Sequence, residues 1–240
     1  MIRIGRRIYG KDGKYTDPSY DGFTNILCLT KSSPYGSIGP YELKDDSGKI
    51  MENIYQAHKI YKTIPKNVER YSRYNSTIIW QQDAETHMTD ENKITPQYWK
   101  WRERLMKNKH PVRYPVGFNY RHKCVGSVYV NDDKTYEILN YIDARKKIYM
   151  PLYIQLVRNK PQFKELKKRL AQGENLLIIE VDGPHQESLE YYKEKYGVND
   201  KFIENNTIVV DKKNMTIMLN DDKHPFGHGY CLGIALNNCI

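Results

Sequence analysis

The apolar residues of this chain occur in short runs, and this pattern limits most strongly what the chain can fold into. Leu176-Leu177-Ile178-Ile179 is typical of the longest runs, whereas a helix that crosses a membrane needs about 18 or more consecutive apolar residues. The sequence therefore predicts no membrane-spanning helix. With 39% hydrophobic residues over 240 positions, the chain can bury a sizeable core and is too apolar for a disordered protein.

The cysteines and the start of the chain predict an intracellular protein. The four cysteines are scattered and form no Cys-x-x-Cys pair, at positions 28, 124, 231 and 239. A disulfide scaffold in a chain of this length would need more of them, so we expect reduced thiols and a cytoplasmic setting. The basic start, Met-Ile-Arg-Ile-Gly-Arg-Arg, is followed by no apolar segment and predicts no secretory signal. We expect no membrane partner and no obligate protein partner.

The charge balance favours an anionic partner. The net charge is +9, from 38 Lys and Arg against 29 Asp and Glu, which suits nucleic acid or a ligand that carries phosphates. The chain also contains 21 tyrosines, whose rings can stack on bases but equally fill cores and surfaces.

The first part of the chain is predicted to be rich in loops and short strands. Residues 1–48 hold several Gly, Pro, Ser and Asp turn signals, with short strands expected at Phe23–Thr30 and Tyr41–Lys44. From Met51 onward, apolar residues at helical spacing predict a helix that Pro65 ends.

The rest of the chain alternates helical and extended patterns. The predicted helices are 96–108, 134–158 with a break at Pro151, 160–172 and 188–196. A buried strand is expected at 176–181, a hairpin from 207–210 and 215–219, and a short apolar element at 232–236. No internal repeat or long linker interrupts the chain. The predicted fold class is α+β, a single and mostly helical domain over residues 1–240 with an irregular N-terminal segment.

Three polar residues share one face of the predicted helix after Met51. Glu52, Gln56 and Lys59 stand at i, i+4 and i+7, so a helix would place a carboxylate, an amide and an amine in a row. A carboxylate can act as a general acid or base, and an amine with a lowered pKa can attack a sugar carbon. The alternative is a solvated stripe in which Glu52 is favoured by the helix dipole.

These residues carry a resemblance to a known family. Phe23-Thr24-Asn25, Gly48-Lys49 and Glu52-x-x-Tyr55-Gln56-Ala57-x-Lys59 resemble the opening signature of the NADAR (YbiA-like) family. The helical block 144–170 and the closing Gly227-His-Gly-Tyr-Cys-Leu-Gly233 follow in the family's order. Residues 185–222 are expected to be an insertion before the closing motif, Met51 stands where the family has Ser, and Tyr230 stands in place of the family's closing Asn.

The resemblance implies an N-glycosidase that removes ADP-ribose from guanine bases in DNA, with no cofactor. It implies a NADAR-like fold, catalytic roles for Glu52 and Lys59, and substrate-binding roles for Asn25 and Gln56. Cleavage of an N-glycosidic bond builds positive charge on the ribose, which a carboxylate stabilises. Glu52 is the first candidate for this carboxylate and Asp182 the second. Lys59 can attack C1, hold the ring-opened sugar, or pair with Glu52 or a phosphate.

The closing motif offers groups for a diphosphate. The glycines allow the backbone N–H groups of Gly227, His228 and Gly229 to approach phosphate oxygens, with Tyr230 next to them; the alternative is an ordinary turn. His224, His228 and Cys231 are metal-ligand residue types, but a zinc site usually needs four ligands in recognisable spacing. We therefore predict no metal.

A basic stretch points to nucleic acid. Residues 104–131 contain six Lys or Arg and no acid, with aromatic residues between them, a pattern typical of nucleic-acid binding. Arg113 is expected to reach a phosphate. The residues expected to contact nucleic acid are Lys107, Lys109, Tyr114, Arg121 and Lys123. The alternative is a solvated basic face with aromatics in the core.

Two other functions stay open. The first is an N-glycosidase of a small phosphorylated nucleotide of the riboflavin-precursor type. The second is a module that binds ADP-ribose or nucleic acid without catalysis. The partner is accordingly ADP-ribosylated DNA or a free nucleotide that contains ADP-ribose. A defence or counter-defence role would fit what the resemblance implies.

Overall fold

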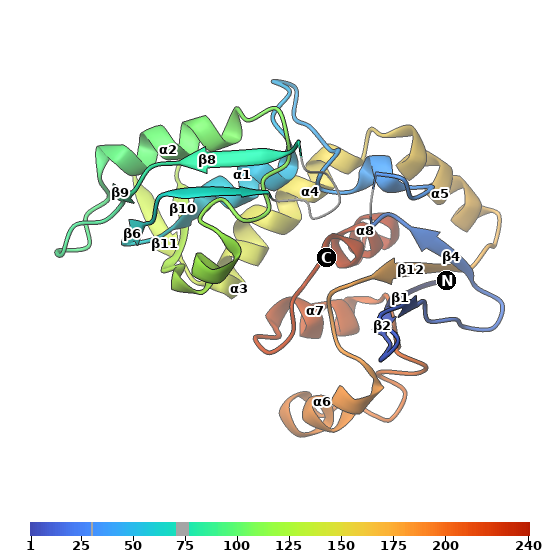
Figure 1. Cartoon of the computed structure of the whole chain (residues 1–240). Helices are drawn as coiled ribbons and strands as arrows, with labels where there is room; N and C mark the ends of the chain where they lie inside the picture. Colours follow the sequence, from blue (N-terminus) through green and yellow to red (C-terminus); the bar gives the residue numbers. More distant parts are fainter. Residues whose placement is uncertain (30, 71–76) are drawn as a thin grey trace. The chain divides into compact units, whose positions relative to one another are not determined.

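The chain forms two compact units that both mix helices with short strands. The computed structural model describes residues 1–29, 31–70 and 77–240. Unit 1 consists of Met1–Gly39 and Met150–Ile240, and unit 2 of Pro40–Tyr149 (Figure 1). The α+β class expected from the sequence is confirmed. That the units fold as one domain stays a prediction.

A four-stranded sheet forms the centre of unit 1. Its strand order is β13 (Thr207–Val209), β1 (Ile2–Arg6), β12 (Leu176–Glu180) and β4 (Thr24–Leu27). β1 and β4 run parallel to β12, and β13 runs antiparallel to β1. All five residues of β12 are buried, as expected for a continuous apolar run in a parallel sheet. The strand predicted at 176–181 is therefore confirmed over 176–180.

The start of the chain is more regular than predicted. β1 lies inside the sheet although its sequence, Ile-Arg-Ile-Gly-Arg, looks basic and polar. The guanidinium of Arg3 is buried, where it donates hydrogen bonds to Thr207 Oγ1 at 2.7 Å and to Glu204 Oε2 at 3.1 Å and lies over the Tyr20 ring. Because these partners satisfy the charge, an arginine is tolerated in a central strand.

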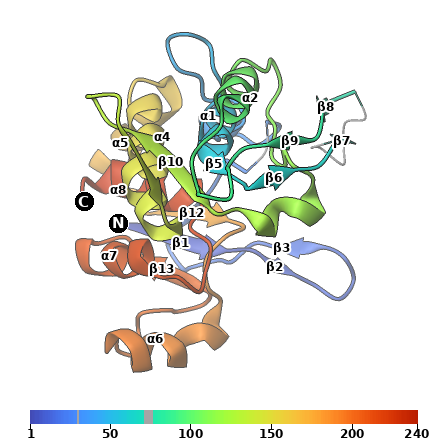
Figure 2. The same ribbon diagram turned by 90° about the vertical axis from the view of Figure 1, so that its left-hand side faces the viewer.

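The helices of unit 1 gather around one largely buried helix. α8 (His228–Asn237) packs on β1 and β12, and α4 (Met150–Val157) and α5 (Pro161–Ala171) pack on α8 (Figure 1). The predicted helix at 160–172 is confirmed as α5, and the predicted helix at 188–196 as α6 (Leu189–Tyr196). The remaining elements of unit 1 are β2 (Ile8–Tyr9) and β3 (Tyr15–Thr16), an exposed hairpin seen in Figure 2, and the 3₁₀ helices η1 (Gly36–Ile38) and η4 (Gln186–Ser188).

The hairpin predicted over residues 207–219 is wrong in its second half. Only β13 is extended, and residues 212–220 form helix α7 (Lys212–Asn220). Asp211 caps this helix by accepting the Asn214 N–H at 2.7 Å, and Met215, Met218 and Leu219 bury one helical face. The cap and the three-to-four residue spacing together define a helix start that the short apolar run concealed. The short element predicted at 232–236 is part of the longer α8.

Unit 2 packs small sheets against two helices. Its core joins α1 (Met51–His58), α2 (Pro96–Met106) and β10 (Gly126–Val130) around Trp101 and Tyr98. β10 pairs with β11 (Tyr136–Leu139) and β5 (Lys59–Ile60). The other elements are β6 (Thr63–Ile64), β7 (Asn67–Arg70), β8 (Ile79–Gln82), β9 (Glu85–Thr86), η2 (Phe118–Lys123), α3 (Tyr141–Ala144) and the π-helical turn η3 (Arg145–Tyr149).

Three predictions for residues 23–64 and 134–158 need correction. The helix after Met51 ends at His58, and the chain continues as strands β5 and β6. Of the two early strands, the first is β4; Thr30 lies outside the described residues. The second is only a single bridge between Lys44 and Ile50. The helix predicted at 134–158 begins only at Tyr141, because residues 136–139 pair with β10 as β11. The disturbance expected at Pro151 takes the form of the π-helical turn just before it.

No helix of the described residues is long and apolar enough to cross a membrane.

Candidate functional site

Helix α1 begins where a tight turn delivers the chain to it. Gly48 has a φ of +82° in the turn that precedes the helix, a conformation that glycine adopts without strain. The N–H groups of Met51 and Glu52 donate to the carbonyls of Leu43 at 2.9 Å and Pro40 at 3.0 Å. The helix start is thus satisfied by the preceding loop, and Glu52 stands in the first turn.

Glu52 and Gln56 share one face of α1, as predicted, and are in contact. Both residues are only 7% exposed, and Gln56 Nε2 donates to Glu52 Oε1 at 2.9 Å. Spacing of i and i+4 on a helix explains this geometry. The carboxylate therefore lies in a buried setting and is held in a fixed orientation, which contradicts the alternative of a solvated stripe.

Lys59 lies beside this pair by a route other than the predicted one. It follows the last helical residue and is extended, with φ −66° and ψ 139°, as the first residue of β5. Its Nζ lies 5.2 Å from the centroid of the Tyr55 ring. Burial lowers the pKa of Lys59, while the charges of Cys124 and Glu52 oppose this shift and Arg113 adds to it. The site therefore makes the neutral, nucleophilic form of the amine easier to reach than it is in water.

Further residues of unit 2 contribute to this site, although the sequence did not single them out. Burial raises the pKa of Tyr55, and the charges of Tyr141 and Glu52 add to this effect. Burial also raises the pKa of the Cys124 thiol. Arg145 is only 1% exposed and lies 4.6 Å from the Tyr141 ring centroid. The burial of Arg145 could not be predicted from hydrophobic periodicity, because a charged residue in a π-helical turn does not follow the helical pattern.

Buried Asn53 positions the loop that leads to Arg113. Its side-chain nitrogen donates to the carbonyls of Asn108 and His110 at 3.0 and 2.9 Å, and its oxygen accepts the Val112 N–H at 2.7 Å. Arg113 follows directly, is exposed, and lies over the Tyr114 ring at 5.2 Å. The sequence analysis did not single out Asn53. Its position on the apolar side of α1 is the feature that could have indicated a buried, hydrogen-bonded amide.

The groups of this site support sugar chemistry. A fixed carboxylate and an amine with a lowered pKa provide an acid or base and a nucleophile. A hollow of about 450 Å³ elsewhere on unit 2 is lined by Lys66, Gln82 and Arg104 among others. None of the residues that line this hollow belongs to the Glu52 site.

The third predicted catalytic residue, Asp182, and the predicted substrate residue Asn25 belong to unit 1. Asn25 lies in β4, where its side-chain nitrogen donates to the Pro18 carbonyl at 3.2 Å. Asp182 is half-buried and follows β12. Its backbone N–H lies 3.4 Å from Glu180 Oε1, so this segment is organised by a neighbouring acid.

The closing glycine turn binds a carboxylate of the chain itself. Glu180 is fully buried and accepts the Gly229 N–H at 2.6 Å and the Val181 N–H at 2.7 Å. The Gly229 donor that the sequence assigned to a phosphate is therefore already used. His228 and Tyr230 are 7% and 1% exposed, which differs from the open turn expected for a bound diphosphate; Gly227 precedes them as the N-cap of α8.

His228 completes a buried ion pair with Glu180. Its Nδ1 lies 3.6 Å from Glu180 Oε2, and its Nε2 lies 3.1 Å from the Cys28 carbonyl. Burial lowers the pKa of His228, but Glu180 and Cys28 outweigh this effect and raise it to about 10. Sequence reasoning missed Glu180, whose signal is an acid that ends a wholly apolar strand.

The basic stretch is only partly free to meet nucleic acid. Lys107 forms an ion pair with Glu103 at 2.6 Å, and the Arg121 guanidinium lies over the Phe118 ring at 3.6 Å. Tyr114 packs edge-on against Phe118. Lys109 and Lys123 are exposed. Among the described residues, no group of three or more His, Cys, Asp or Glu side chains could hold a metal ion.

Comparison with protein-family models, curated proteins and solved structures gave no significant match.

Proposed function

We propose that this chain is an N-glycosidase of the NADAR type that removes ADP-ribose from modified guanine bases in DNA. The observation that carries the proposal is the buried carboxylate of Glu52, held by Gln56 and accompanied by an amine, that of Lys59, whose pKa burial lowers. The resemblance of the sequence motifs, in their order, to those of the NADAR family also supports the proposal.

The chemistry follows from what each group can do at a ribose. As the bond from C1 to the base nitrogen lengthens, positive charge develops on the sugar ring, and the Glu52 carboxylate stabilises it. The base leaves with the electron pair of the C1–N bond and takes up a proton, while the neutral Lys59 amine bonds to C1. The amine proton passes to the ring oxygen as the C1–O bond breaks and an imine forms, and one water hydrolyses this imine to give free ADP-ribose and the amine. Gln56 acts on the carboxylate rather than on the sugar, so it is a positioning residue.

The arginines and basic residues supply the recognition of the substrate. Arg113 is exposed at the end of the loop that Asn53 holds and suits a phosphate of ADP-ribose. Lys109 and Lys123 can meet the DNA backbone. A base inside a duplex must be flipped out before its sugar bond can be reached, so we expect a preference for single-stranded DNA.

Release of ADP-ribose from an ADP-ribosylated oligonucleotide tests the proposal. Glu52→Gln keeps the size of the side chain and is expected to slow release by about 10²–10⁴-fold. Glu103→Gln is the matched control, since Glu103 is an exposed acid on α2 and its variant should act like the wild type. A wild-type protein that releases nothing, or a Glu52→Gln variant that is as fast, would contradict the proposal.

A second candidate is an N-glycosidase of a small phosphorylated nucleotide. The ion pair of Lys107 with Glu103 and the packing of Arg121 on Phe118 favour it, because they reduce the number of free cations for DNA. Substrate affinity at two salt concentrations separates the candidates, since only DNA binding releases many counterions and weakens steeply with salt. Binding without turnover over a long incubation would favour the non-catalytic module.

A further inference from the structure

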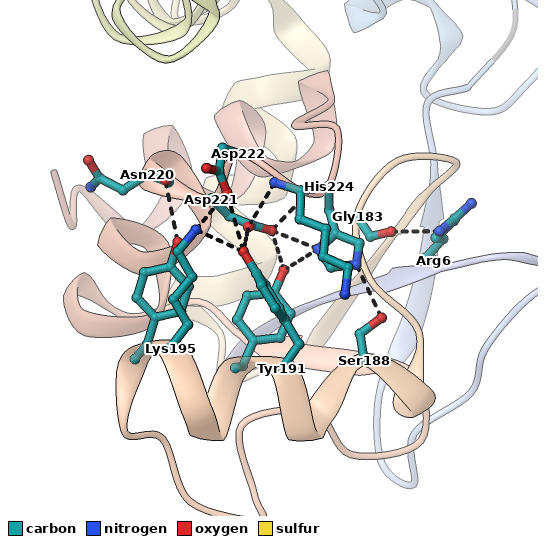
Figure 3. A network of polar contacts seen from close by, with 12 residues as sticks. Arg6, Gly183, Ser188, Tyr191, Lys195, Asn220, Asp221, Asp222 and His224 are labelled. Carbon is teal, nitrogen blue, oxygen red and sulfur yellow. Dashed lines mark hydrogen bonds and ion pairs between the residues drawn. The ribbon is translucent and has the colours of Figure 1, made fainter.

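A second polar cluster lies in unit 1, around Asp221 in the segment between α7 and α8. Asp221 is fully buried. Its Oδ1 accepts hydrogen bonds from the Tyr191 hydroxyl at 2.8 Å and from the Lys223 N–H at 3.1 Å, and its Oδ2 accepts from Tyr192. Figure 3 shows these contacts joining α6 to the segment after α7. None of these residues takes part in the site at Glu52.

The histidine of this cluster is held in one tautomer. His224 Nδ1 lies 2.7 Å from Asp221 Oδ2. Burial alone would raise the pKa of Asp221, but the hydrogen bonds from Tyr192, Tyr191 and His224 outweigh it and lower the pKa, so the carboxylate is ionised. Two lone pairs cannot face each other at this distance, and His224 Nδ1 must therefore carry the proton. In the neutral imidazole Nε2 is then the acceptor.

The second ring nitrogen of His224 faces a serine hydroxyl. Ser188 Oγ lies 3.1 Å from His224 Nε2 (Figure 3), so the hydroxyl can donate to the neutral imidazole. The Tyr192 ring stacks on the face of the imidazole, with ring centroids 5.4 Å apart, and limits its rotation. Asp221, His224 and Ser188 thus form a chain of hydrogen bonds in the order acid, base and nucleophile.

Ser188 lies where one helical segment runs into the next. It ends the 3₁₀ helix η4 and leads directly into α6, and its own backbone is helical, with φ −83° and ψ −3°. Ser188 is half-buried, so a reagent can reach it.

We infer that Ser188, His224 and Asp221 form a second hydrolytic site that cleaves uncharged acyl esters. Ser188 is the nucleophile and His224 the general base, while Asp221 is a positioning residue that acts through His224. Of the exposed acids close to Ser188 in the sequence, Glu190 pairs with Lys193 at 2.8 Å and Glu187 lies 3.5 Å from the His185 ring. The acids therefore have basic partners, which suits an uncharged ester better than a charged substrate.

The reaction needs only water as a co-substrate. The Ser188 proton moves to His224 Nε2 while Oγ bonds to the acyl carbon, and the same proton then passes to the leaving alcohol as its C–O bond breaks. A water molecule gives a proton to His224 and its oxygen to the acyl carbon. The bond from Oγ to the acyl carbon breaks, and His224 returns the proton to Ser188. One ester and one water give one acid and one alcohol.

A serine-selective fluorophosphonate probe tests this site in the full chain. We expect the wild type to be labelled once, at Ser188 as located by mass spectrometry of peptides, and Ser188→Ala to lose the label. Ser47→Ala is the matched control, since the Ser47 hydroxyl is exposed and donates to a carboxylate, Asp45 Oδ1 at 2.8 Å. This variant should label like the wild type, and Ser188→Ala should leave release of ADP-ribose unchanged.

The two other residues are tested through the rate of labelling. His224→Gln is expected to slow it at least about 10³-fold, and Asp221→Asn about 10⁴-fold. Asp221→Asn should also change the pH profile of labelling, whereas a structural defect would scale the rate equally at every pH. A folded wild type that labels no faster than Ser188→Ala overturns the inference, whatever the other variants do.

Discussion

Two buried glutamates, one in each unit, are treated very differently by their surroundings. Glu180 of unit 1 accepts two close backbone N–H groups and pairs with His228, whose pKa rises to about 10. Glu52 of unit 2 accepts from the neutral amide of Gln56, and the pKa of the lysine beside it is lowered. Glu180 thus holds the start of α8 and the imidazole of His228, whereas Glu52 lies beside the amine that we propose as the nucleophile.

Removing the two carboxylates should therefore have opposite consequences. Glu180→Ala leaves a charged imidazole buried without its partner and uncaps α8, and we expect the free energy of unfolding to fall by about 3–5 kcal/mol. Glu52→Ala should cost clearly less stability while abolishing turnover. Urea denaturation of both variants measures this, with Glu190→Ala as an exposed control. Equal losses for both glutamates would remove the distinction.

The pH dependence of stability sharpens the comparison on the side of Glu180. The folded-state pKa of His228 is about 10, above its ordinary value of 6.5. The ion pair therefore contributes its full stability below about pH 6.5 and loses it as the pH rises through about 10. The difference in unfolding free energy between the wild type and His228→Gln should shrink over this range. A difference that stays constant would show that the imidazole is neutral in the fold.

Asn53 tests how the Glu52 site is held together. Asn53→Ala removes three hydrogen bonds to residues 108–112 and should lower the free energy of unfolding by about 1–3 kcal/mol. Because the loop carries Arg113, KM for the ADP-ribosylated substrate should rise more than kcat falls. A loss of stability with unchanged KM would mean that Arg113 does not contact the substrate.

Lys59 gives a smaller effect with the opposite sign of pH dependence. The pKa of Lys59 is lowered in the folded state, so the unfolded chain binds more protons than the folded one. The unfavourable effect of Lys59 on the free energy of unfolding therefore becomes smaller as the pH rises toward 10.5. Lys59→Met should be about as stable as the wild type at high pH and more stable, by about 1 kcal/mol, at neutral pH. Thermal unfolding at several pH values measures this. A Lys59→Met variant that is less stable than the wild type at neutral pH would contradict a lowered pKa of Lys59.

The smallest expected effect concerns the basic stretch. Lys123 is exposed, so Lys123→Gln should reduce the slope of log affinity against log salt for single-stranded DNA by about 1. Lys107→Gln should change the slope less, because Lys107 already pairs with Glu103. Fluorescence anisotropy at several salt concentrations gives the slopes. Equal changes would mean that the ion pair opens when DNA binds.

The sequence predicted those parts of the fold that local patterns determine. Helix α5, with Pro161 in its first turn, and the wholly apolar strand β12 were found at nearly their observed bounds. Strand β1 was missed because Arg3 is neutralised by Glu204, more than two hundred residues away in the sequence. The residues after Asp211 were misjudged because a short apolar run fits a strand and a helix alike, and the cap decides.

The candidate site shows the same limit. The contact of Glu52 with Gln56 could be predicted because a helix fixes residues four apart. Lys59 was expected beside them for the wrong reason, since it lies after the end of α1. Asn53, Arg145 and Glu180 were missed because their roles depend on partners or burial that no local pattern contains.

A crystal structure of the protein with ADP-ribose bound tests the central claim most directly. The account predicts that C1 of the ribose lies within reach of the Glu52 carboxylate and of Lys59 Nζ, with a phosphate on Arg113. ADP-ribose bound away from Glu52, with these side chains contacting only protein, would contradict it.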